Sequence, residues 1–197
     1  AKTFEINKYD LTNLIKNNNN NSFNNLDPFN TGYTSSSIDE AFINYLISLE
    51  SNYPALFQSF YKPCLKSKEY IIGLIDYYTD IFPNVNHSLA KAIVDVESGY
   101  SSSYMLQKNN LFGGMCANGL IQYKNIEYGI LKYIIMLSDD YYTNGLNTVE
   151  AIGYKFNPII INGYKEANPT WITNVYNAMS KYQNKTINSL TELNSLT

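Results

Sequence analysis

An apolar stripe at helical spacing, ending at a glycine, constrains the fold of this chain more than any other sequence feature. Four apolar residues recur at i, i+3, i+4 and i+7: Leu89, Ala92, Ile93 and Val96. This spacing is typical of a helix that buries one face. Gly99 tolerates the left-handed backbone with which many helices end. The stretch predicts a buried helix that ends near Gly99 and has Ser88 as its N-cap.

Helical spacing recurs along most of the chain and predicts a mainly helical protein. We expect helices over residues 9–15, 38–50, 67–81, 148–154 and 170–182, a short helix between Pro54 and Pro63, and another from Glu127 to the Asn144-Gly145 stop. The Asn-rich stretch 16–33 is typical of a loop. Residues 155–169 contain two prolines and a glycine, and we expect them to be irregular.

One β-hairpin is expected to interrupt the helices. Residues 113–123 place the pair Asn118-Gly119 between two short runs that suit strands, and Asn-Gly is a strong signal for a two-residue hairpin turn. The fold class is therefore mainly α, in the α+β sense, with a small β-hairpin. No repeat or interdomain linker appears. We predict a catalytic core over residues 81–185, preceded by a helical extension (1–80) that packs on it and followed by a tail (186–197).

Charge and composition exclude several classes of partner. The chain has 14 Lys+Arg against 17 Asp+Glu and no basic cluster, so we do not expect it to bind nucleic acid. No apolar run is long enough to span a bilayer, and any export signal is expected to lie outside the chain. The charged fraction is only 16%, while tyrosine occurs 19 times. Such a surface suits neutral sugars, although an AT-rich genome would give the same bias.

The few cysteines and histidines argue against a metal site. Cys64, Cys116 and His87 cannot complete a tetrahedral zinc site, and we expect neither a metal nor another cofactor. The two cysteines form a disulfide if the protein is exported, or else they are two packed thiols. His87 precedes the expected N-cap and is interpreted as a surface or loop residue, not a base.

Three carboxyl groups between residues 81 and 137 are candidates for acid catalysis: Asp95, Glu97 and Glu127. Cleavage of a glycosidic bond needs a protonated carboxyl near the leaving oxygen and usually a second carboxylate. Glu97 is the best candidate, because it lies in the last helical turn beside Gly99. The helix dipole and partial burial both raise the pKa of a carboxyl there. The alternative is a solvated surface glutamate.

Several separated motifs resemble one enzyme family. Residues 92–99 (AIVDVESG), Ser102-Ser103, residues 109–113 (NNLFG), residues 123–130 and residues 154–158 (YKFNP) with Trp171 occur in order. Together they resemble the endo-β-N-acetylglucosaminidase domains (glycoside hydrolase family 73) of clostridial and staphylococcal bacterial autolysins. The resemblance covers residues 86–182.

This resemblance implies a lysozyme-like helical lobe, a small β-lobe, and a groove between them that binds the glycan strand of peptidoglycan. The family hydrolyses the β-1,4 bond between N-acetylglucosamine and N-acetylmuramic acid, and its general acid corresponds to Glu97. The second catalytic group is a β-lobe carboxylate, the N-acetyl group of the substrate, or a tyrosine. Glu127 and Tyr154 occupy the matching positions, although Glu127 also suits a purely stabilising role at a helix N-terminus.

Other residues near the motifs are candidates for substrate binding. Tyr123 and Trp171, like Tyr154, are expected near the groove, where rings stack on sugar faces. Asn109 and Asn110 bind sugar amides or fix the loop, and Phe112 is expected to pack in the core beneath Gly113-Gly114.

The resemblance also implies a setting and leaves alternatives. We expect a secreted, wall-associated protein, with this chain as the monomeric catalytic domain of a larger one. A lytic transglycosylase or muramidase on the same fold is one alternative. A wall-binding or phage-tail module without activity is the other.

Overall fold

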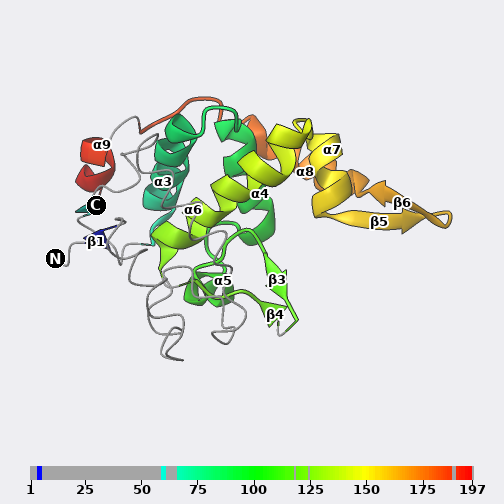
Figure 1. Ribbon diagram of the computed structural model, residues 1–197, viewed down its shortest axis with the longest axis horizontal. Helices are drawn as coiled ribbons and strands as arrows, with labels where there is room; N and C mark the ends of the chain where they lie inside the picture. The colour runs from blue at the N-terminus through cyan, green and yellow to red at the C-terminus, as the bar shows by residue number, and fades with distance from the viewer. Residues whose placement is uncertain are drawn as a thin grey trace.

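The computed structural model describes residues 4–5, 59–60, 66–117, 119–123, 125–187 and 190–196, and this part of the chain is mainly helical (Figure 1). The helices expected over residues 9–15 and 38–50 and between Pro54 and Pro63, and the loop over 16–33, lie outside the described residues. Cys64 also lies outside them, as does the side chain of Cys116, so the pairing of the cysteines stays a prediction. The boundaries of the expected core, extension and tail are likewise untested.

The α-helices of the described residues are separated along the chain by turns and short strand pairs. They are α3 (Lys68–Ile81), α4 (His87–Ser98), α5 (Ser103–Gln107), α6 (Ile126–Met136), α7 (Val149–Phe156), α8 (Pro169–Met179) and α9 (Leu190–Ser195). After α6 the chain continues through a π-helical turn, η5 (Leu137–Tyr141), and a 3-10 turn, η6 (Tyr142–Asn144). Gly145 then ends this run in the left-handed conformation, with φ 80°, as the Asn-Gly pair predicts.

Strands occur only as short antiparallel pairs in the described part of the chain. β1 (Phe4–Glu5) pairs with β2 (Ser59–Phe60), β3 (Met115–Cys116) with β4 (Gly119–Leu120), and β5 (Pro158–Ile161) with β6 (Tyr164–Ala167). The β3–β4 pair confirms the hairpin expected over residues 113–123.

The core lies where α3, α4, α6 and α8 pack on one another, α4 against α8 and α3 against both α4 and α6. The stripe that predicts α4 is largely buried: Leu89, Ala92 and Ile93 are at most 3% exposed. Close packing also depends on Gly129 of α6, because a Cβ atom there would lie 1.9 Å from the carbonyl oxygen of Asn109. The helix α6 can therefore approach the loop after α5 only through a glycine.

The start of α4 corrects two expectations. Asn86, not Ser88, is the N-cap, and its side-chain oxygen accepts a hydrogen bond from the backbone N–H of Leu89 at 2.9 Å. Ser88 lies inside the first turn and donates to the carbonyl oxygen of Tyr182 at 2.6 Å. His87 is the first helical residue rather than a loop residue. Asparagine caps as well as serine, so the sequence signal was present two residues earlier.

The segment 155–169 is a larger correction, because it is not irregular. It contains the β5–β6 hairpin, in which four pairs of residues face each other across the strands. Asn162 and Gly163 form the turn with φ 50° and 83°, the positive values that a two-residue hairpin turn needs. In Figure 1 this hairpin projects beyond α7 and α8, away from the helical body.

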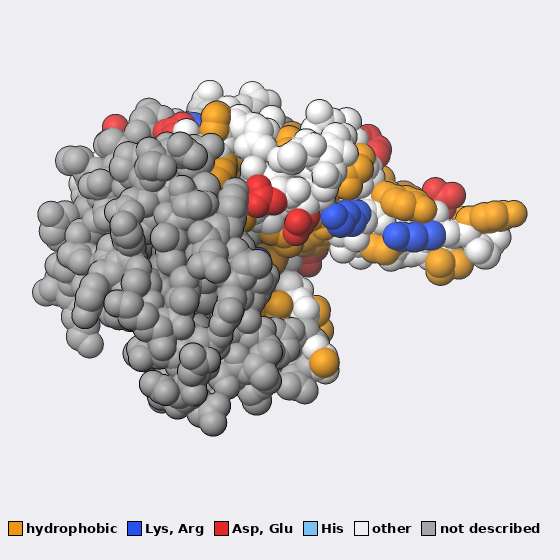
Figure 2. Space-filling view, in the orientation of Figure 1, with side chains coloured by type: hydrophobic (Ala, Val, Ile, Leu, Met, Phe, Trp, Pro, Cys, Tyr) orange, Lys and Arg blue, Asp and Glu red, His pale blue; other side chains and the backbone are white. Residues whose placement is uncertain are grey.

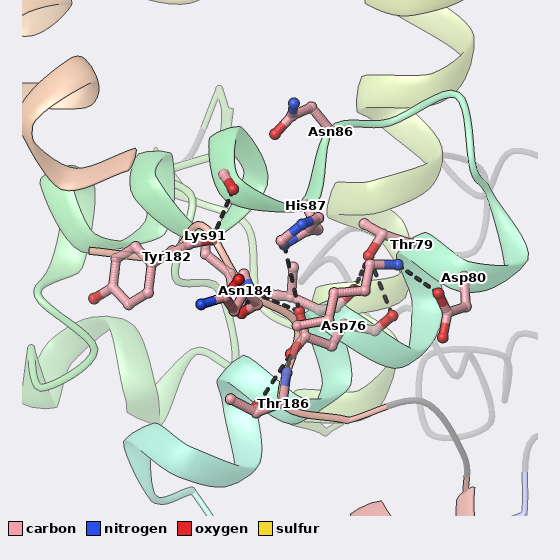
Figure 3. Close-up of polar contacts among 12 residues, drawn as sticks. Asp76, Thr79, Asp80, Asn86, His87, Lys91, Tyr182, Asn184 and Thr186 are labelled. Carbon is pink, nitrogen blue, oxygen red and sulfur yellow. Dashed lines mark hydrogen bonds and ion pairs between the residues drawn. The ribbon is translucent and has the colours of Figure 1, made fainter. Parts of the chain in front are cut away.

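A buried ion pair joins the segment after α8 to the core (Figure 3). Lys91 of α4 and Asp76 of α3 are 1% and 0% exposed, and their Nζ and Oδ1 atoms are 2.6 Å apart. The other Asp76 oxygen accepts from the backbone N–H of Thr186 at 2.8 Å and from its hydroxyl at 3.1 Å. Lys91 also donates to the carbonyl oxygen of Asn184. Each charge is thus hydrogen-bonded as well as paired, which burial requires.

Candidate functional site

Glu97 lies in the last turn of α4, where the helix meets a pocket. The carboxylate follows the buried stripe, and the helix ends at Gly99, whose φ of 60° is left-handed. The side chain of Glu97 is partly buried. Both features agree with the position predicted for it.

The pocket has a volume of about 350 Å³ and brings together residues from four parts of the chain. Its lining consists of Glu97, Phe112, Gly113, Gly114, Met115, Met136, Tyr141, Lys155, Phe156 and Asn157. These residues come from the end of α4, the loop before β3 with Met115 of β3, α6 with η5, and the end of α7 with the residue after it. Glu97 is the only carboxyl group among these lining residues.

Trp171 of α8 fixes the Glu97 carboxylate. Its indole Nε1–H donates to Oε1 of Glu97 at 3.0 Å. The ring stacks on Phe156, with centroids 5.8 Å apart, and packs against Gly153, where a Cβ would lie 2.9 Å from an indole carbon. Helices α7 and α8 therefore hold the donor in place, and the absence of a side chain at Gly153 makes room for the ring.

Burial and this hydrogen bond act in opposite directions on Glu97. Burial raises the pKa of the carboxyl above its ordinary value, and the Trp171 hydrogen bond, which favours the ionised form, partly offsets the rise. A raised pKa suits a group that must deliver a proton.

Lys155 supplies the positive charge of the pocket lining. Its Nζ donates to the carbonyl oxygen of Asp140 at 2.8 Å and lies 4.5 Å from the centroid of the Tyr141 ring. These contacts hold the amino group of Lys155 against η5.

Asn109 and Asn110 hold the loop that lines the pocket, but they are not themselves among the lining residues. Both are buried. Asn109 donates to the carbonyl oxygen of Tyr123 at 2.9 Å. Asn110 donates to the carbonyl oxygens of Gly114 and Ile121, each at 2.9 Å, and accepts from the N–H of Gly113. Of the two roles considered for these asparagines, the structure shows the one that fixes the loop.

The three candidate aromatic residues occupy different environments. Tyr123 is 2% exposed and packs against Phe112, and Trp171 is 4% exposed. Phe112 is itself buried beside Gly114, as predicted. Tyr154 is 46% exposed on α7, and its ring lies 4.6 Å from Nζ of Lys165. Trp171 donates a hydrogen bond to Glu97, and none of the three aromatic residues is among those that line the pocket.

Glu127 lies in the core rather than in the pocket. It lies in the first turn of α6, is 0% exposed, and accepts a hydrogen bond from the hydroxyl of Tyr70 at 2.8 Å. Its second oxygen has no hydrogen-bond partner. Burial raises the pKa of this carboxyl to about 7. The structure therefore does not bring Glu127 together with Glu97.

Sequence reasoning missed part of the pocket. Met136, Tyr141, Lys155 and Asn157 line it but were not singled out. Tyr141 continued the apolar spacing of the helix from Glu127, and Lys155 and Asn157 belonged to the YKFNP motif. The helical spacing could have placed Tyr141 near the site, and the motif could have placed Lys155 and Asn157 there.

Neither a metal site nor a membrane span is seen in the part of the chain that the structure describes. No group of three or more His, Cys, Asp or Glu side chains gathers there in a way that could hold a metal ion. None of the helices there is long and apolar enough to cross a membrane.

Comparisons with known proteins identify no relative. No family model, no curated protein and no solved structure matches the chain.

Proposed function

We propose that this protein is a peptidoglycan hydrolase that cleaves the β-1,4 bond between N-acetylglucosamine and N-acetylmuramic acid, with Glu97 as the general acid. The observation that carries the proposal is the pocket carboxyl itself. Glu97 is partly buried, has a raised pKa, and is held by Trp171 at the edge of a 350 Å³ pocket. The family resemblance of the motifs around it supplies the substrate.

The arrangement around the pocket supports a lysozyme-like fold. A helical body carries Glu97, and the loop that leads into the β3–β4 hairpin lines the same pocket. In this proposal the glycan strand crosses between them. The protein acts outside the cell, at the wall, as the monomeric catalytic domain of a larger protein.

The lone carboxyl of the pocket bears on the mechanism. A retaining glycosidase with two catalytic carboxyl groups holds them about 5–5.5 Å apart, but Glu97 has no second carboxyl beside it among the described lining residues. This favours substrate assistance, in which the N-acetyl oxygen of the sugar attacks the anomeric carbon while Glu97 protonates the leaving oxygen. Water then adds to the anomeric carbon, opens the cyclic intermediate and restores the N-acetyl group. A lytic transglycosylase also needs one acidic residue, so the same observation keeps that reaction as the second candidate.

The identity of the products tests the reaction. Purified cell wall is digested, and mass spectrometry identifies the new chain ends. N-acetylglucosamine reducing ends support the proposal. Anhydro-muramic ends would assign a lytic transglycosylase, and muramic reducing ends a muramidase.

Substitution Glu97→Gln tests the role of the acid. General acid catalysis contributes about 10²- to 10⁴-fold, and we expect hydrolysis to fall by that factor while folding and wall binding survive. Glu150→Gln is the matched control, since Glu150 is exposed and contacts Tyr176 rather than the pocket. Equal activity of the Glu97→Gln variant and the wild type would refute the assignment, and no turnover in either would indicate a binding module.

A further inference from the structure

The β5–β6 hairpin exposes apolar side chains without a covering layer. Ile160 is 69% exposed, Tyr164 is 73% and Ile161 is 37%. A two-stranded ribbon is only marginally stable by itself, and clustered exposed apolar groups mark interaction sites. Figure 2 shows hydrophobic side chains along the hairpin, together with one basic side chain, which belongs to Lys165, the single lysine of residues 158–167.

One face of the hairpin combines aromatic, apolar and basic groups. Ile160 and Lys165 are opposite each other across the strands, so their side chains lie on the same face. Tyr154 of α7 borders this face, because its ring contacts the Lys165 amino group at 4.6 Å. The adjacent register positions pair Ile159 with Glu166 and Ile161 with Tyr164. These four residues therefore lie on the opposite face. We call the face that bears Tyr154, Ile160 and Lys165 the hairpin platform.

The hairpin platform continues from the pocket. Lys155, Phe156 and Asn157 line the pocket, and β5 begins at the next residue, Pro158. A pocket of this size, near the lower end of the range for small-molecule sites, cannot enclose a long polymer. A glycan chain that leaves the pocket on the side of Asn157 would reach the hairpin next.

We propose that the hairpin platform binds the part of the glycan strand that extends out of the pocket. Tyr154 and Ile160 cover apolar sugar faces, and Lys165 pairs with a carboxylate of a peptide stem. This inference rests on the proposed function, because it assigns the same polymer to a second surface.

Charge distinguishes this occupant from a second copy of the chain. A two-fold contact places the same patch on both partners, and through this face it would bring the positive charges of the two Lys165 side chains into one small interface. Carboxylates on the peptide stems instead complement Lys165. An anionic sugar polymer is therefore the occupant that fits the platform.

Binding to purified cell wall tests the inference apart from catalysis. In the Glu97→Gln background, the platform variant Ile160→Thr with Lys165→Glu is compared with a matched control, Tyr104→Ala with Lys108→Glu. Tyr104 is exposed and Lys108 is half-buried. They form a similar pair on and just after α5, with Nζ of Lys108 6.0 Å from the ring centroid of Tyr104. Co-sedimentation measures the dissociation constant, and we expect the platform variant to bind at least 5-fold more weakly and the control to bind unchanged.

Several outcomes would overturn the inference. Unchanged wall binding by the platform variant, or equal weakening in the control, would do so, and so would a parent protein that does not bind the wall. If light scattering shows a dimer that the platform variant loses while it still binds the wall, the platform is a contact between two copies instead. Thermal unfolding checks that the variants fold, and Lys165→Gln alone serves if the double variant does not. The wild type could bind cell wall through the platform without cleaving it. That result would refute the proposed hydrolysis but would still support glycan binding by the platform.

Discussion

Replacing Trp171 with phenylalanine isolates the hydrogen bond that acts on the Glu97 carboxyl. The variant keeps an aromatic ring against Phe156 but removes the indole N–H that donates to Glu97 at 3.0 Å. A hydrogen bond to a charged group contributes about 1.5–3 kcal/mol when buried. Because Glu97 is only partly buried, we expect an effect of about 1.4 kcal/mol, which equals one pKa unit.

The direction of the change follows from which form the N–H stabilises. It favours the carboxylate, so its loss raises the pKa of Glu97. A general acid works in its protonated form, and the rate falls as pH rises through that pKa. We therefore expect the alkaline limb of kcat/KM against pH to move up by about one unit.

Two measurements check this shift. The pH profile is recorded with cell-wall substrate, and NMR titration of the Glu97 carboxyl reports the pKa without turnover. Phe156→Leu is the control: it alters the stacking under the indole but keeps the donor, so the pKa should stay in place even if the rate falls. An alkaline limb that is unchanged in Trp171→Phe, or that moves to lower pH, would refute the reasoning.

Two further predictions concern stability. Because burial raises the pKa of Glu127 from 4.5 to about 7, the folded state binds more protons than the unfolded state in that window, so stability falls as pH rises through it, by up to about 3 kcal/mol. Glu127→Gln should remove this loss, and urea unfolding at pH 5 and pH 8 checks it; the same pH dependence in both proteins would contradict the assignment. Gly129→Ala would place a Cβ 1.9 Å from the Asn109 carbonyl oxygen and should destabilise the fold by about 3 kcal/mol, as in overpacked cores. An unchanged melting temperature would show that α6 can move away at little cost.

Local patterns predicted much of the helical body. The spacing of Leu89, Ala92 and Ile93, with Gly99 after them, was sufficient to place α4 and to leave Glu97 in its last turn, because periodicity and end signals are local. The hairpin over residues 158–167 was missed for the opposite reason. The prolines were given more weight than Asn162-Gly163, although that pair follows three isoleucines and is itself a strong turn signal.

The partners of the site residues were beyond local reasoning. Trp171 and Glu97 are 74 residues apart, and only the packing of α4 on α8 brings the indole to the carboxylate. The sequence around Glu127 is equally consistent with an exposed helix start and a buried one. Its burial depends on Tyr70, which lies 57 residues away on α3.

The buried pair of Asp76 and Lys91 also bears on the order in which the protein can fold as it is made. Asp76 lies 110 residues before Thr186, which supplies two of its hydrogen bonds. At about 5–20 residues per second, the ribosome needs roughly 5 to 20 seconds to bridge that interval. An ion pair without its hydrogen-bond partners is costly to bury. We therefore expect α3 and α4 to keep water between them on the nascent chain until the residues after α8 have emerged.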